Sequence, residues 1–419
     1  MDPQRAFRIS TVVIIVTVTA LGASLLLPRQ TTPVHTSVAE PGRVTPAVAT
    51  SRASLDAVIG EMRTRVAADP GDGAAAVLLA DALMRAARVE ADASLPLEAE
   101  RALRATLSHG NDYAARRMLA AVYLSQHRFR EALDLALRAQ RDQPEDAWNY
   151  ATAGDALVEL GRYDEAFGMF DKAVARRPDA GSYARIAYGK ELTGNLEGAL
   201  EVMRMAAEAT APQDVEGRAW AQTQLGLLSL QLGRLNEAER AFEHAQFLFP
   251  EHPYALVGRI RLAIAREQYA AALELVRRVP STPETVAIRG DLQRVLGDAR
   301  AAEASYRESE QLERDGWKSE APQPAALARF MAERNRSPQE AIALAERAAA
   351  ERQDIHTLDA LAWSYFKGGR LPEAQRAIRR ATRTGTADAR IRCHAAVIDQ
   401  AIRSGTVGTC DPLNPMSRS

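Results

Sequence analysis

Two stretches of the chain, beginning at residues 159 and 231, repeat one pattern of residues. They read ELGRYDEAFGMFDKAVARRPD and QLGRLNEAERAFEHAQFLFPE. Leu-Gly-Arg, Glu-Ala, Phe, Ala and Pro occupy the same places in both. A repeated unit of this length is one supersecondary element, which cannot bury its apolar face alone and is repeated until stacking buries it.

The alanine of the Glu-Ala step marks the period of the repeat. It recurs at Ala132, Ala166, Ala199, Ala238, Ala272, Ala302, Ala341 and Ala374. A spacing near 34 residues is typical of a helix–turn–helix unit. Composition agrees, since hydrophobic residues make up 47% of the chain and aromatic residues only 5%, which favours packed helices over β-sheet. The sequence therefore predicts an all-α fold.

Small residues mark where the two helices of a unit touch. In 147–179, Tyr150, Ala153, Gly154 and Leu157 share one helical face, and Gly161 lies at the turn. Close approach of two helices requires small side chains on both. The packing positions predicted from this pattern are Gly154, Ala166, Phe170, Gly226, Ala238 and Phe242.

The pattern resembles the tetratricopeptide repeat superfamily over roughly residues 80–388, most specifically in 147–179 and 219–252. The resemblance implies a right-handed α-solenoid of about eight to nine helical hairpins. Because a solenoid exposes an apolar face at each end, we expect a capping helix and a divergent repeat in 54–112, the solenoid in 113–388, and a capping helix and tail in 389–419.

The resemblance also implies a concave binding groove lined by the first helix of each hairpin. The positions carried over are Arg117, Trp148, Asp155, Arg185, Tyr188, Trp220 and Gln224, with His356, Asp359, Trp363 and Phe366 at the far end. Trp, Tyr and Arg are over-represented at binding hot spots, so we expect Trp148, Tyr188 and Trp220 to anchor a peptide. The alternative is that these aromatic side chains pack between neighbouring hairpins. The lysine and asparagine clamp of the chaperone-binding subgroup is not present.

The N-terminus differs from the rest of the chain. Residues 1–8 contain Arg5 and Arg8, and an uncharged run follows from 9 to 27. This run has nearly the length needed to span a bilayer as a helix, and the arginines favour a cytoplasmic N-terminus. We predict a transmembrane anchor, with a cleaved signal sequence as the alternative, followed by a Pro/Thr/Val/Ala-rich tether over 28–53.

The two cysteines, Cys393 and Cys410, lie near the C-terminus. If the solenoid is exported, a disulfide between them is permitted and would contribute roughly 3 kcal/mol of stability. Two unpaired thiols are the other interpretation, and the sequence does not decide between them.

No catalytic or cofactor-binding motif is found, and the seven histidines are scattered. We therefore expect no enzyme activity, cofactor or metal. A formal net charge of −1 gives no indication of nucleic-acid binding. The near absence of lysine suggests a bacterial source.

Together these features predict a membrane-tethered scaffold or adaptor of the bacterial cell envelope. The solenoid would lie in the periplasm or outside the cell, or be secreted to the periplasm if the N-terminal segment is cleaved. It would bind peptide segments of other proteins, and self-association is a further alternative. The alternative is a regulatory subunit that senses a small molecule or carbohydrate.

Overall fold

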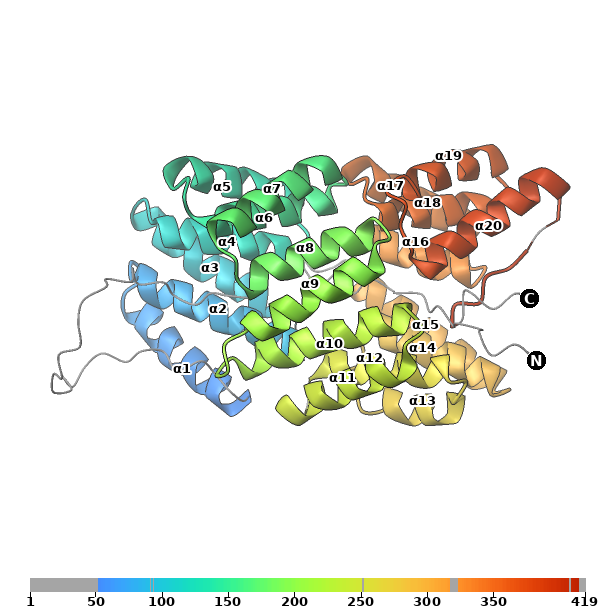
Figure 1. Ribbon diagram of the computed structural model, residues 1–419, viewed down its shortest axis with the longest axis horizontal. Coiled ribbons are helices and arrows are strands. Elements are labelled where there is room, and N and C mark those ends of the chain that lie inside the picture. The colour runs from blue at the N-terminus through green and yellow to red at the C-terminus, as the bar shows by residue number, and fades with distance from the viewer. Residues whose placement is uncertain are drawn as a thin grey trace.

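The computed structural model describes residues 52–413 apart from 91, 93, 251, 317–322 and 407, and these residues form α-helices without a strand (Figure 1). The helices are α1 (Arg52–Ala68), α2 (Gly73–Glu90), α3 (Ser94–His109), α4 (Tyr113–Ser125), α5 (Phe129–Asp142), α6 (Ala147–Glu159), α7 (Tyr163–Arg176), α8 (Ala180–Leu192), α9 (Leu196–Ala209), α10 (Val215–Gln231), α11 (Leu235–Leu248), α12 (Pro253–Ala265), α13 (Tyr269–Val276), α14 (Pro283–Val295), α15 (Ala299–Gly316), α16 (Pro324–Glu333), α17 (Pro338–Glu351), α18 (Ile355–Lys367), α19 (Leu371–Ala381) and α20 (Ala389–Ser404). The predicted all-α class is confirmed.

Consecutive helices from α2 to α19 pack in pairs, so the described part of the chain holds nine antiparallel hairpins. This number lies within the predicted range. Helix α1 packs on α2 at one end, and α20 packs on α18 and α19 at the other. The last two residues of the predicted tether, 52 and 53, already belong to α1.

Aspartates and glycines set where several of the helices begin and end. The side chains of Asp112, Asp146 and Asp179 accept hydrogen bonds from backbone N–H groups of the first turns of α4, α6 and α8. Between the two helices of a hairpin the chain turns through a left-handed residue, such as Gly161 with φ +74° or Gly194 with φ +81°. The glycine of the repeated Leu-Gly-Arg therefore has a conformational role.

The predicted packing positions lie inside the hairpins. Ala166 and Phe170 of α7 are buried against Gly154 of α6, where a Cβ atom would overlap the Phe170 ring. The same relation holds between Gly226 of α10 and Phe242 of α11, beside the fully buried Ala238. The missing side chains make room for the rings, which fill the space between the helices.

The solenoid curves until its last hairpins return to its early ones, as the adjacent α7 and α17 show (Figure 1). The hydroxyl of Tyr163 accepts the Ile355 N–H at 2.8 Å, and Arg383 donates to the Gly161 carbonyl at 3.0 Å. One apolar cluster runs from Ile59 in α1 to Ala401 in α20. We call the surface where α5–α7 meet α17–α19 the seam. The predicted extended groove is thus closed on itself.

The seam contains a buried ion pair. Arg352 contacts Glu159 at 2.7 Å and Asp354 at 2.8 Å, and it stacks 4.8 Å from the centre of the Phe129 ring. Burial raises the pKa of Glu159 to about 7, although Arg352 acts to lower it. A second junction joins α2 to α10, where Arg88 contacts Glu216 at 2.8 Å.

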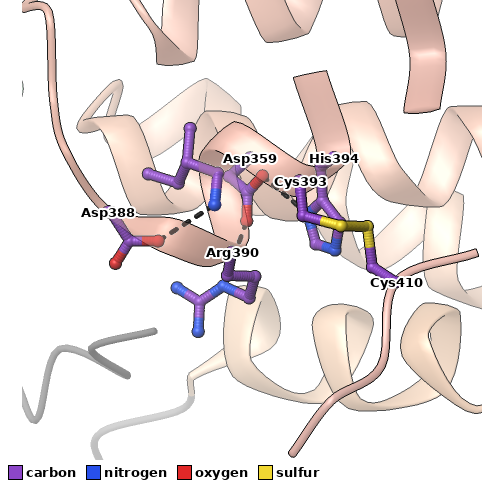
Figure 2. Close-up of a disulfide and its surroundings, with 7 residues drawn as sticks. Asp359, Asp388, Arg390, Cys393, His394 and Cys410 are labelled. Atoms are coloured by element: carbon purple, nitrogen blue, oxygen red, sulfur yellow. Dashed lines mark hydrogen bonds and ion pairs between the residues drawn. A yellow bond between two sulfur atoms is a disulfide. The ribbon is translucent and has the colours of Figure 1, made fainter. Parts of the chain in front are cut away.

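The C-terminal segment is fastened by a disulfide between Cys393 of α20 and Cys410, with the two Cα atoms 6.1 Å apart (Figure 2). Beyond it, Leu413 is buried in an apolar cluster with residues of α12, α13 and α14. The structure therefore has the disulfide rather than the two thiols.

The predicted anchor at 9–27, the n-region at 1–8 and residues 28–51 of the tether lie outside the described residues. Within the described helices, none combines the length and the apolar character needed to cross a membrane.

Candidate functional site

The residues predicted to line the groove lie on α4, α6, α8 and α10, and most of them are engaged with one another. Arg117 contacts Asp146 at 2.7 Å, and its guanidinium lies 4.9 Å from the centre of the half-buried Trp148 ring. This cation–π pair joins two neighbouring hairpins. Of the three predicted aromatic anchors, Trp148 and Tyr188 stay partly exposed.

Asp155 and Arg185 form a buried ion pair between α6 and α8. Arg185 donates from Nη2 and Nε to the carboxylate at 2.7–3.0 Å, and its Nη1 donates to the Gly181 carbonyl. The two side chains are 7% and 5% exposed. Burial raises the pKa of Asp155 to about 6 while Arg185 acts to lower it. Because each charge satisfies the other, neither side chain is free to recognise a partner.

Trp220 is buried, whereas Tyr188 is half-buried. Trp220 is 6% exposed within an apolar cluster of α8, α9 and α10, and Tyr188 packs at the edge of the main core. Burial raises the pKa of the Tyr188 hydroxyl well above its usual value. Gln224 is half-buried. For Trp220 the structure favours the packing interpretation over the anchor interpretation.

The closed solenoid instead contains a partly open hollow of about 360 Å³, which we call the chamber. Five distant elements contribute Arg88 from α2, Phe129 from α5, Tyr254 from α12, Arg329 from α16 and His356 from α18. Its wall also contains prolines and threonines: Pro253, Pro280, Thr282, Pro283, Thr285, Pro324 and Thr357. Its volume lies at the lower end of the range typical of ligand sites, which is about 300–1,000 Å³.

Several polar atoms of the chamber wall are buried and lack a hydrogen-bond partner among the described residues. They include both imidazole nitrogens of His356, Nδ1 of His127 and Nη1 of Arg88. Burial lowers the pKa of His356 and that of His127, the latter to about 4, so both rings are neutral. A neutral imidazole has one donor and one acceptor, and leaving each unsatisfied costs about 1–3 kcal/mol.

Two further groups of opposite charge face the chamber. The ion pair of Arg329 with Glu333 is long, with 3.9 Å between Nε and Oε1. Burial lowers the pKa of the Arg329 guanidinium. Burial also raises the pKa of Glu313 to about 7, against the effect of Arg329. The chamber therefore has a hydrogen-bond donor, Arg329, and an acceptor, Glu313, whose charges are only weakly neutralised by neighbours, beside apolar walls. Perturbed groups in a cavity are typical of binding sites.

A buried cluster of Asp359, Arg390 and His394 has residue types that also occur in catalytic sites, but it lies between α18 and α20. His394 Nδ1 contacts Asp359 at 2.8 Å, and Arg390 contacts the other Asp359 oxygen at 3.3 Å (Figure 2). His394 is 1% exposed and its ring stacks on Trp363 at 3.9 Å. This cluster fastens α20 to α18. Among the residues that the structure describes, no group of three or more His, Cys, Asp or Glu side chains could hold a metal ion.

Among the residues that line the chamber, His356 was predicted as a groove position on the first helix of a hairpin. None of the seven residues from Arg117 to Gln224 lines the chamber. Arg88, Tyr254 and Arg329 were missed because residues so far apart meet only when the solenoid closes. The period of the repeat predicts each hairpin but contains no signal for this closure.

Stacked helical hairpins that form an α-solenoid define the class of this protein as a helical-repeat protein. Residues 152–214 and 223–284 match the tetratricopeptide repeat family, and they include both stretches in which the repeated pattern was first seen. Proteins built from these repeats generally mediate protein–protein interactions, typically without catalysis. No curated protein sequence matches the chain.

Among solved structures, a chain of the APC/C hetero-tetramer Cut9–Hcn1 is similar, with a TM-score of 0.50 and 16% identity. The similarity covers 75% of this chain and 58% of that one. The human IFIT1 dimer with m7Gppp-AAAA gives a TM-score of 0.49 at 15% identity, covering 80% of this chain and 77% of that one. At such identities the similarity to Cut9–Hcn1 shows the fold alone.

Proposed function

We propose that this protein is a non-catalytic scaffold or adaptor that binds a segment of a partner protein in its chamber. The observation that carries the proposal is the set of unpartnered buried polar atoms, on His356, His127 and Arg88, within an apolar cavity. A peptide can satisfy the polar atoms and cover the apolar walls at once, because its backbone donates and accepts hydrogen bonds and its side chains pack on apolar surface.

The test uses peptide-display selection against the full chain, followed by affinity measurement on the wild type, Arg329→Met and Arg307→Met. Arg329 is a half-buried cation whose nearest carboxylate, that of Glu333, is 3.9 Å away, so we expect the fold to tolerate a methionine there. Arg307 is an exposed residue of α15 that does not line the chamber. We expect Arg329→Met to weaken the selected peptide about tenfold and Arg307→Met to leave its affinity unchanged. Selection of no peptide, or equal affinities for all three proteins, would contradict the proposal.

A second candidate function is the sensing of a small polar molecule or carbohydrate. The volume of the chamber, within the range of small-molecule sites, favours this alternative. It predicts that a compound from a sugar and metabolite panel raises the melting temperature of the wild type but not of Arg329→Met. Peptide selection would then return nothing that depends on Arg329.

We further propose that residues 9–27 anchor the protein in the inner membrane of a bacterium, with the solenoid in the periplasm and a role in envelope assembly. The support is the uncharged run after Arg5 and Arg8, together with a disulfide of the kind that persists in oxidising compartments. Trypsin added to intact spheroplasts should digest the arginine-rich solenoid while a cytoplasmic marker survives. Digestion only after lysis would contradict this orientation.

A further inference from the structure

A second hollow lies at the surface of the seam, between α5 and the loop after α6 on one side and α17 and α19 on the other. Its volume is about 730 Å³. We call it the seam groove. It is lined by Arg130, Leu133, Asp134, Leu137, Leu160, Gly161, Arg162, Ala350, Glu351, Gln353, Arg380 and Arg383. None of these positions belongs to the concave surface predicted from the repeat.

The charge of the seam groove is unbalanced. Its lining has four arginines against one aspartate and one glutamate, whereas the whole chain has a formal net charge of −1. Asp134 pairs with Arg138 of the same helix and Arg162 pairs with Glu165, which leaves Arg130, Arg380 and Arg383 beside Glu351. The groove is therefore a positive depression on a nearly neutral molecule, which favours an anionic partner.

Three of these arginines hydrogen-bond to neutral groups and form no ion pair with a carboxylate of the described residues. Arg130 donates to the Glu351 carbonyl at 3.1 Å, and Arg380 donates to the Gln353 side-chain oxygen at 2.5 Å. Arg383 donates to the carbonyls of Gly161 and Gln353 at 3.0 and 2.8 Å. These contacts fix the guanidiniums at the rim of the groove, and each arginine has further N–H donors for a bound carboxylate.

The floor of the groove is apolar. Leu133 and Leu137 are separated by one turn of α5, and Leu160 approaches from the end of α6. Leu133 is buried, while Leu137 and Leu160 are half-buried. A floor of leucines within a rim of arginines complements a segment that bears apolar side chains on one face and carboxylates beside them.

We propose that the seam groove is a docking site for an acidic amphipathic segment of a partner protein, with carboxylates on Arg130, Arg380 and Arg383 and apolar side chains on the leucines. The inference rests on the proposed scaffold function but concerns a different surface. A nucleic acid would satisfy the arginines and leave the leucine floor uncovered, so the protein segment is favoured.

The test measures fluorescence anisotropy of labelled helical peptides with the full chain. One peptide carries Glu and Leu at helical spacing, a second has Lys in place of Glu, and a third has Ser in place of Leu. An oligouridylate of equal charge serves as the nucleic-acid probe. The groove variant is Arg130→Gln with Arg380→Gln, and the matched control is Arg141→Gln with Arg376→Gln. The control removes two exposed charges from the same helices, α5 and α19, without touching the groove lining.

We expect the Glu–Leu peptide to bind, the other two peptides to bind at least about tenfold more weakly, and the groove variant to lose about tenfold in affinity while the control stays within about twofold. Equal losses in both variants would overturn the proposal. So would absence of binding, or tighter binding of the oligouridylate with the same dependence on Arg130 and Arg380. If display peptides respond to Arg329→Met while no Glu–Leu peptide binds, the scaffold function stands and the seam groove does not.

Discussion

At the scale of the residue, this fold depends on where side chains are missing. Gly154 and Gly226 lie mid-helix, where glycine costs about 0.5–1 kcal/mol relative to alanine. The rings of Phe170 and Phe242 occupy the space that a side chain at Gly154 or Gly226 would need. The same residue type elsewhere in a helix has no such role, as at Gly168, where a Cβ atom would meet nothing within 4 Å.

We therefore predict opposite effects from the same substitution in one hairpin. Gly154→Ala should lower the free energy of unfolding by about 1–3 kcal/mol, since the Phe170 ring has to move. Gly168→Ala should raise it by about 0.5–1 kcal/mol through helix propensity. Chemical denaturation of both variants checks this. Equal effects would show that Gly154 is not a contact position.

His252 offers a prediction that depends on pH. It caps α12, where its Nδ1 accepts the Ala255 N–H at 3.3 Å, and it is 1% exposed. Burial lowers its pKa from 6.5 to about 4; the neighbouring Glu216 opposes this shift, and Arg88 adds to it. The unfolded chain therefore binds a proton in this range before the folded protein does, and His252 costs stability as the pH falls.

Relative to His252→Asn, which keeps a capping acceptor, the wild type should lose about 3 kcal/mol of unfolding free energy as the pH falls from 6.5 to about 4. Urea denaturation of both proteins at several pH values measures the difference. Parallel curves would mean that His252 has the same pKa in the folded and the unfolded protein.

At the scale of the element, each hairpin is predictable from the sequence and the contact between distant hairpins is not. The period, the turn glycines and the small residues all act within one repeat, so nine hairpins follow from local pattern. The seam joins residues such as Tyr163 and Ile355, which no local pattern relates. For the same reason, Asp155 and Arg185 were expected to face a partner, whereas adjacent hairpins place them against each other.

Gly161 takes part both in a turn within one hairpin and in the contact between distant hairpins. Its φ of +74° makes the turn between α6 and α7, and a Cβ atom there would overlap the carbonyl of Gln353 across the seam. Gly369 has nearly the same φ, +76°, in the turn between α18 and α19, with nothing within 4 Å of its Cβ position.

Gly369→Ala should cost about 1–2 kcal/mol of stability from backbone conformation alone. Gly161→Ala should cost clearly more and should also speed hydrogen exchange of the seam amides around Ile355, because the two sides of the seam are forced apart. Exchange that is the same in both variants would contradict a contact between Gly161 and Gln353.

At the scale of the whole molecule, both hollows depend on closure of the solenoid. Closure brings Arg88, Tyr254, Arg329 and His356 around one chamber and creates the seam groove at the outer surface. The disulfide between Cys393 and Cys410 holds the C-terminal segment so that Leu413 reaches α12–α14. An open solenoid with the same hairpins would have neither cavity.

The most direct measurement of closure is a double-mutant cycle on Glu159 and Arg352, which lie 193 residues apart in sequence and 2.7 Å apart in the structure. It is made from unfolding free energies of the wild type, Glu159→Gln, Arg352→Met and the double variant. At pH 8 the Glu159 carboxyl, with its pKa raised to about 7, is ionised in the folded protein. The closed solenoid predicts a coupling energy of about 1–3 kcal/mol. Additive effects, within about 0.3–0.5 kcal/mol, would mean that the two ends of the solenoid do not meet.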